Sequence, residues 1–179
     1  MHQFPHMCGG MMNPSVSLCE PLAKLKREHT PLREKMNQFA ADASNVGHDP
    51  QVADWAQKLS DLKTKIVAFI QELDPHSELE EGTLFPLMAK YIGRDVGPIA
   101  VMEYEHEQAK QYLKTFVELM ESEPAPVCKE RARELASYAI RAHSILTDHF
   151  MKEENVLFPM AETILNDDDK NELRRKVCN

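Results

Sequence analysis

Six residues with metal-binding side chains lie among apolar residues that repeat at helical spacing. They are His29, His76, Glu80, His106, His149 and Glu153. Imidazole and carboxylate groups are ligands that proteins use for iron and other transition metals, and carboxylates can be shared between two ions in the core of a helical bundle. This set of residues therefore predicts a two-metal centre held by four histidines and two glutamates.

Helical spacing indicates which glutamates belong to the site. His76 and Glu80 are four residues apart, as is the equivalent pair later in the chain. Four residues turn a helix by about 400°, so each pair projects from one face. The next residues, Glu81 and Glu154, lie about 100° further round and are expected to point towards solvent.

A simpler alternative is a neutral core histidine that is hydrogen-bonded to a backbone carbonyl. It would explain one histidine but not the whole set, because buried carboxylates are costly unless they are paired or bound to a cation. No lysine or arginine falls on the apolar stripe of the second or fourth stretch. A pair of divalent cations resolves this difficulty.

The chain also repeats itself around these residues. Segment 76–86 (HSELEEGTLFP) matches segment 149–159 (HFMKEENVLFP) in its histidine, its paired glutamates and its closing Leu-Phe-Pro. Glu28-His29 likewise matches Glu105-His106. The repeat predicts a doubled helical hairpin with a pseudo-twofold metal site.

Four amphipathic stretches carry the six residues and predict an all-α fold. We expect an antiparallel up-down-up-down four-helix bundle with an irregular N-terminal arm and a short C-terminal tail. The first stretch ends before Asp49, which can cap a second helix with Pro50 at its first position. The second ends near Gly93, the third is closed by segment 124–126, and the fourth ends near Asn166.

The same patterns divide the chain into three parts. Residues 1–17 are predicted to be the irregular arm, 18–165 the bundle, and 166–179 a charged tail that can be helical. The arm carries His6 and Cys8, which would be additional ligands if the arm folded over the bundle. Disorder of the arm is the favoured alternative.

Composition narrows the range of partners. The net charge of −8 argues against nucleic acid and anionic membranes, which attract basic surfaces. No apolar run approaches the roughly 20 residues that span a bilayer. The four cysteines show neither zinc-type pairing nor dense disulfide spacing, so a reducing cytoplasm is the expected location.

At these residues the sequence resembles the hemerythrin-like (HHE cation-binding) family, over roughly residues 18–165. It is closer to the iron-repair, nitric-oxide-responsive branch than to the oxygen-carrying hemerythrins. The resemblance implies two non-haem iron ions bridged by Glu80, Glu153 and an oxo or hydroxo group, with the four histidines as terminal ligands. By analogy with that branch, His29 and His149 would serve one iron and the other two histidines the second.

Two departures from the oxygen carriers bear on function. Those proteins have a second histidine four residues after the one on the third helix, where this chain has Lys110, and they use His-x-x-x-x-Asp on the fourth helix. Each iron would keep up to two open positions, which favours a reactive site over simple transport. Glu103, three residues before His106, is either a further ligand or a solvated flank residue.

Three functions are compatible with such a site. The first is a redox protein that binds and converts O2, nitric oxide or peroxide, which would also call for an electron donor protein. The second is a non-catalytic sensor or carrier of O2 or nitric oxide. The third is a protein that stores iron or donates it.

Overall fold

The computed structural model describes residues 16–178, and these contain helices but no β-strand. The elements are α1 (Glu20–Asn45), α2 (Ala56–Leu79), the π-helical turn η1 (Glu80–Leu84), α3 (Phe85–Ile92), α4 (Pro98–Ser122), α5 (Lys129–Lys152), the π-helical turn η2 (Glu153–Leu157), α6 (Phe158–Ile164) and α7 (Asp167–Val177). The all-helical fold class is therefore confirmed. Among the described residues, no helix combines the length and apolar character that a membrane crossing needs. The predicted arm lies almost wholly outside the described residues, His6 and Cys8 included.

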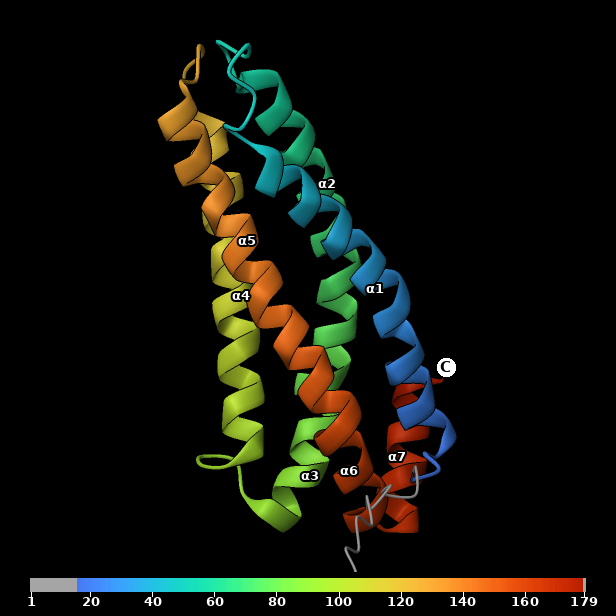
Figure 1. Ribbon diagram of the computed structural model, residues 1–179. Helices are drawn as coiled ribbons and strands as arrows, with labels where there is room; N and C mark the ends of the chain where they lie inside the picture. Colours follow the sequence, from blue (N-terminus) through green and yellow to red (C-terminus); the bar gives the residue numbers. More distant parts are fainter. Residues whose placement is uncertain (1–15, 179) are drawn as a thin grey trace, which may run out of the picture.

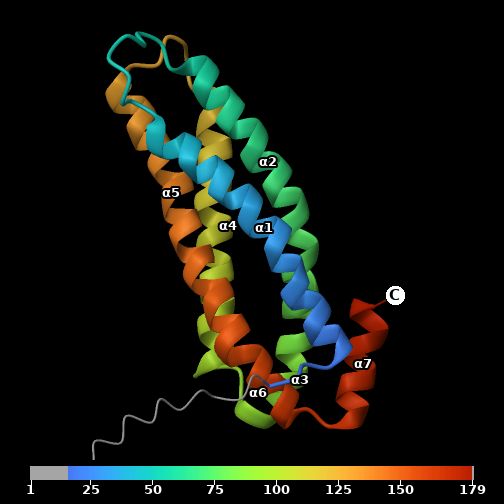
Figure 2. The same ribbon diagram turned by 45° about the vertical axis from the view of Figure 1, so that its right-hand side comes forward.

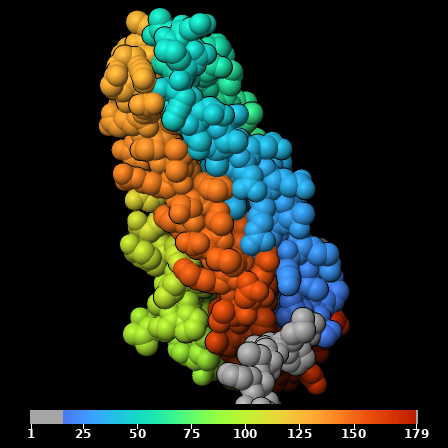
Figure 3. Space-filling view, viewed as in Figure 1, coloured from blue at the N-terminus to red at the C-terminus, as the bar shows by residue number. Residues whose placement is uncertain are grey.

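The four long helices α1, α2, α4 and α5 lie side by side as a helical bundle (Figures 1 and 2). The short helices α3, α6 and α7 gather at one end, and the connections 46–55 and 123–128 lie at the other. On the face shown in Figure 3, the side chains of α5 lie between those of α1 and α4.

The apolar stripes of the long helices meet in the interior, as their spacing predicts. Two apolar clusters form there, one around Phe39 and Phe69 and the other around Phe85 and Phe158. On α1, His29 falls between a residue of each cluster. The other three candidate histidines lie at the same level, so a polar layer separates two apolar layers.

The start of α2 differs from the prediction of a helix that begins at Pro50. The helix begins at Ala56, and segment 46–55 is a loop. The carboxylate of Asp49 accepts a hydrogen bond from the Gln51 amide at 2.9 Å, which closes a local turn instead of capping a helix. The N-cap residue of α2 is Trp55, which makes no side-chain cap hydrogen bond, and the preceding Asp54 accepts a hydrogen bond from the Ala56 amide at 2.9 Å.

The predicted tail contains the regular helix α7. Asn166 caps it by accepting a hydrogen bond from the Asp169 amide at 2.9 Å, and the acidic first turn complements the helix dipole. Leu173 and Val177 are buried in the cluster around Phe85, so α7 packs against the end of the bundle beside α1 (Figure 2).

We expect Leu173→Ala to lower the free energy of unfolding by about 2–5 kcal/mol, because it leaves a cavity in a fully buried position. Urea unfolding followed by circular dichroism measures the change. Lys176→Ala on the exposed side of α7 is the matched control, with an expected effect within about 0.5 kcal/mol. Equal effects of the two variants would show that α7 is not part of the folded core.

Candidate metal centre

The structure brings all six predicted site residues together in the polar layer of the bundle. Each is at most 3 % exposed. Their donor atoms form two groups, each with atoms within 4.8 Å of one another. The first group is His29, His76, Glu80 and Glu153, and the second is His106, His149, Glu80 and Glu153.

The two glutamates belong to both groups because each directs one oxygen to either side. Glu80 places Oε1 3.4 Å from His76 Nε2 and Oε2 3.6 Å from His106 Nε2. Glu153 places Oε2 3.3 Å from His29 Nε2 and Oε1 3.1 Å from His149 Nε2. This is the arrangement expected of carboxylates that join two cation positions.

The histidines are grouped differently from the expectation drawn from the iron-repair branch. His29 and His76 share one position, with their Nε2 atoms 3.2 Å apart, and His106 and His149 share the other. The expected grouping of His29 with His149 is therefore not what the structure shows. His149 also lies on a helix that contacts α1, so helix neighbours alone do not decide the grouping. The positions of the donor atoms decide it, because those of His29 and His76 face each other and His149 belongs to the second group.

The chemistry of these six side chains fits a bound cation. Both oxygens of Glu80, both oxygens of Glu153 and Nε2 of His149 are buried without a hydrogen-bond donor or acceptor. Buried polar atoms normally have a partner, and a buried carboxylate without one is costly. A metal site at this position supplies the missing partner for every one of these atoms.

The pKa values of the metal-free site also show that buried charge is unfavourable there unless it is paired. Burial, together with the neighbouring Glu153 carboxylate, raises the pKa of Glu80 well above its ordinary value. Burial opposes the charge on His149 as well, but Glu153 and a hydrogen bond to Glu105 outweigh it and raise the pKa of His149 to about 9. Without a metal, the site is therefore neutralised by protons.

Each of the two inner glutamates, Glu80 and Glu153, is the first residue of a π-helical turn. In η1 the Phe85 amide donates to the carbonyl of Glu80, five residues back, and in η2 the Phe158 amide donates to that of Glu153. A proline follows each of these phenylalanines, and proline has no N–H to continue the regular ladder. Such wide turns are frequent at functional sites.

An outer ring of four glutamates orients the histidines. Each accepts a hydrogen bond from an Nδ1–H group, because a carboxylate can only accept, and this leaves Nε2 free to bind a metal. The pairs are His76 with Glu28 at 2.9 Å, His106 with Glu81 at 2.7 Å, His149 with Glu105 at 3.2 Å, and His29 with Glu154 at 2.8 Å. The expectation that Glu81 and Glu154 point away into solvent is therefore wrong.

Cations hold three of these outer carboxylates in place. Arg33 donates to Glu154 at 2.6 Å, Lys110 donates to Glu81 at 2.9 Å, and Lys152 donates to Glu105. The hydrogen bond from His106, with the help of Lys110, lowers the pKa of Glu81 to about 2. Lys110 thus lies outside the histidine layer as a support of Glu81.

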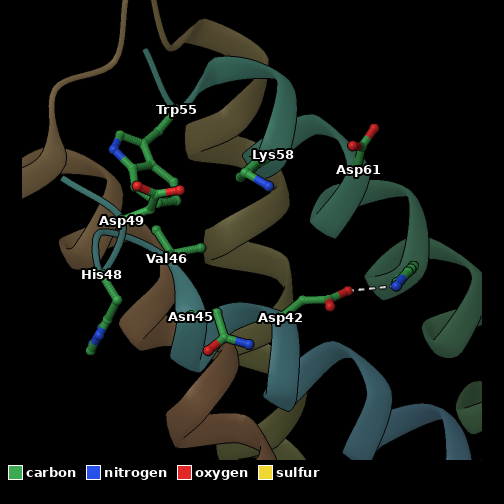
Figure 4. Close-up of a pocket in the computed structure, with 9 residues that line it drawn as sticks. Asp42, Asn45, Val46, His48, Asp49, Trp55, Lys58 and Asp61 are labelled. Atoms are coloured by element: carbon green, nitrogen blue, oxygen red, sulfur yellow. Dashed lines mark hydrogen bonds and ion pairs between the residues drawn. The ribbon is translucent and has the colours of Figure 1, made fainter. Parts of the chain in front are cut away.

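Three other polar residues considered in the sequence lie elsewhere. Glu103 accepts a hydrogen bond from Arg94 at 2.8 Å and belongs to neither donor group. His143 bonds to Asn37 at 2.8 Å on the surface. His48 lies in the α1–α2 loop, beside a pocket of about 580 Å³ at the far end of the bundle (Figure 4).

Aromatic rings shield the histidine layer from water. Phe150 stacks on His29 with ring centroids 4.3 Å apart, and Phe158 stacks on it at 5.6 Å. Phe85 stacks on His106 at 5.7 Å. All three rings are fully buried, so the centre has a dry, low-dielectric environment in which charge interactions are strong.

A comparison with known proteins identifies the class to which this site belongs. The chain matches the hemerythrin HHE cation binding domain over residues 20–161, and it belongs to that family.

Iron-sulfur cluster repair proteins are among the similar proteins. YtfE of Musicola paradisiaca is 32 % identical over 142 residues, which cover 76 % of this chain and 62 % of the relative. YtfE of Salmonella schwarzengrund is 29 % identical over 137 residues, which cover 75 % and 61 %. The chain thus spans less than two thirds of the length of these relatives. The resemblance to the iron-repair branch is confirmed, and no solved structure gives a significant match.

Replacing the outer glutamates should weaken metal binding. We expect Glu81→Gln and Glu154→Gln each to lower metal affinity by roughly 10–100-fold, because the amide no longer holds the histidine tautomer as firmly. Competition with a chelator of known affinity measures this. Glu103→Gln is the control and should leave affinity unchanged; a loss as large as that of Glu81→Gln would make Glu103 part of the site.

Metal loading at neutral pH should release protons. The pKa of His149 is raised to about 9 in the metal-free protein, so at neutral pH this ring carries a proton that a metal must displace, and the raised pKa of Glu80 acts in the same direction. Titration calorimetry with ferrous iron in two buffers of different ionisation enthalpy counts the protons, and we expect at least about one per chain. Identical heats in both buffers would contradict this protonation state.

Proposed function

We propose that the protein holds two iron ions in this centre, bridged by Glu80 and Glu153, with the four histidines as terminal ligands. The observation that carries the proposal is that each buried carboxylate faces both histidine pairs with a different oxygen. Family membership supports iron as the metal. An oxo or hydroxo bridge between the ions stays a prediction from the resemblance.

We also propose that the four long helices alternate in direction as an up-down-up-down bundle. Consecutive long helices contact each other, α1 with α2 and α4 with α5, and they are joined at their ends. Contacts of α1 with α5 and of α2 with α4 close the ring. This arrangement brings one histidine from each long helix to the same level.

The function that this centre supports best is reaction with a small molecule such as O2, nitric oxide or peroxide, in the service of iron-sulfur cluster repair. Each iron would have about four bonds from the protein, which leaves up to two positions of an octahedron for an exchangeable ligand. Lys110 stands where oxygen carriers have a further histidine. Its ammonium group donates a hydrogen bond to Glu81, so it supports an outer glutamate and supplies no extra imidazole ligand. Repair enters the proposal through the names of the relatives.

Iron donation is the second candidate. A protein that gives iron to a damaged cluster would also suit the repair role named for the relatives.

An electron donor protein as partner and a cytoplasmic location stay predictions from the sequence.

Metal analysis combined with optical spectra tests the proposal. The protein is loaded with ferrous iron under anaerobic conditions, its iron and zinc content is measured, and it is exposed in turn to O2, nitric oxide and peroxide. We expect two iron ions per chain, a spectral change with at least one of the molecules, and its consumption. Glu80→Ala should abolish both the second iron and the reaction, because it removes a bridge.

Three results would separate the alternatives. A stable and reversible spectrum without consumption of the small molecule supports a sensor or carrier. Transfer of iron to an apo iron-sulfur protein, without reaction with any of the three molecules, supports donation. A protein that binds only zinc, or no metal, after growth with ample iron contradicts the proposed function.

A further inference from the structure

The two halves of the centre differ in how the outer glutamates are held. Glu81 and Glu105, in the half of His106 and His149, are each bound by a lysine. In the other half Glu154 is bound by Arg33. Glu28, the partner of His76, makes no ion pair with lysine or arginine among the described residues, and its side chain is 33 % exposed.

The internal repeat shows why this one cation is missing. When Glu28-His29 is aligned with Glu105-His106, Arg33 falls opposite Lys110, so both halves have that clamp. When segment 76–86 is aligned with segment 149–159, the residue opposite Lys152 is Leu79. A leucine therefore stands where the other half has the cation that fixes the outer carboxylate.

A pocket opens at the same place. It has a volume of about 250 Å³, and Leu79, Glu28 and His76 are part of its wall. Two in-helix prolines, Pro31 of α1 and Pro75 of α2, also line it. Proline removes a helix hydrogen bond, so each helix lacks one backbone hydrogen bond beside this pocket. The positions that the repeat aligns with the prolines are glutamine and aspartate.

The pocket thus borders His76, the one histidine whose supporting carboxylate makes no ion pair with a lysine or arginine among the described residues. A glutamate that is free to turn towards water leaves its histidine without an orienting partner, and the ring can then rotate away from a metal. His106 and His149 lack this freedom, because two lysines fix their glutamates. His76 is only 3 % exposed, so a path from the pocket to its ring would open only when Glu28 moves.

We propose that the two metal positions are inequivalent, and that the divalent ion held by His29 and His76 exchanges with solvent through the Leu79 pocket while the other ion is retained. This inference rests on the proposed two-metal centre. The species that leaves is a ferrous ion, and the acceptor is any nitrogen or oxygen chelator small enough to reach His76. The protein would then keep a folded centre with one ion after it has given up the other.

Chelation kinetics test the inequivalence. Protein loaded with two ferrous ions is mixed anaerobically with excess ferrozine, and the coloured complex is followed over time. We expect two phases of equal amplitude, one iron per chain in each, with rates that differ by roughly tenfold or more.

Reciprocal substitutions at the aligned positions assign the phases. Leu79→Lys installs the missing cation beside Glu28 and should slow the fast phase by roughly tenfold, with the slow phase unchanged. Lys152→Leu removes the clamp of Glu105 and should accelerate the slow phase by a similar factor. Leu79→Met is the control for a change of side chain without charge and should leave both rates unaltered.

The outcomes separate this inference from the proposed function. Two ions that leave at a single rate, or a slow phase that responds to Leu79→Lys, would overturn the inference and leave the two-metal centre intact. Failure to load two ions overturns both. Thermal unfolding checks that each variant folds. If Leu79→Lys does not fold, the Lys152→Leu variant still tests the inference, because an unchanged slow phase in that variant would reject it.

Discussion

Two ionisable carboxylates in the middle of an apolar bundle impose the constraint on which this structure depends. Glu80 and Glu153 are fully buried, and none of their oxygens has a hydrogen-bond donor. Such a pair cannot stay ionised without positive charge nearby, and no lysine or arginine reaches them among the described contacts. Protons neutralise the site when it is metal-free, and in the proposed function a pair of cations does so when it is loaded. The stability of the fold and the binding of metal are therefore linked.

Around the two inner carboxylates, successive layers of side chains alternate between groups that donate hydrogen bonds and groups that accept them. Histidines surround the inner carboxylates, glutamates accept from the histidines, and lysine or arginine holds three of those glutamates near the surface. Each layer fixes the next, so the orientation of a ring in the interior depends on a cation at the edge. Stacked phenylalanines keep water out of the middle, which makes the outer ring the main route by which solvent influences the metals.

Periodicity predicted the inner layer because burial leaves a clear signal in sequence. A polar residue at a core position, such as His106, interrupts an apolar stripe. Periodicity could not predict the outer ring. In an ideal α-helix, Glu81 and Glu154 lie about 100° from the inner residues and would therefore point towards solvent. The π-helical turns that begin at the preceding glutamates, and the histidines of neighbouring helices, bring them inward. The signal that was available was the recurrence of Glu directly before or after the inner residues in both repeats, as in Glu28-His29 and Glu105-His106.

The decisive property of this centre is where metal binds in the iron-loaded protein. Crystals grown after anaerobic loading, with anomalous scattering measured at the iron edge, would show how many ions are bound and where. We expect two peaks, one beside His29 and His76 and the other beside His106 and His149, with each of the two inner glutamates bonded to both ions. A single peak, or a peak whose ligands are His29 and His149, would contradict this expectation.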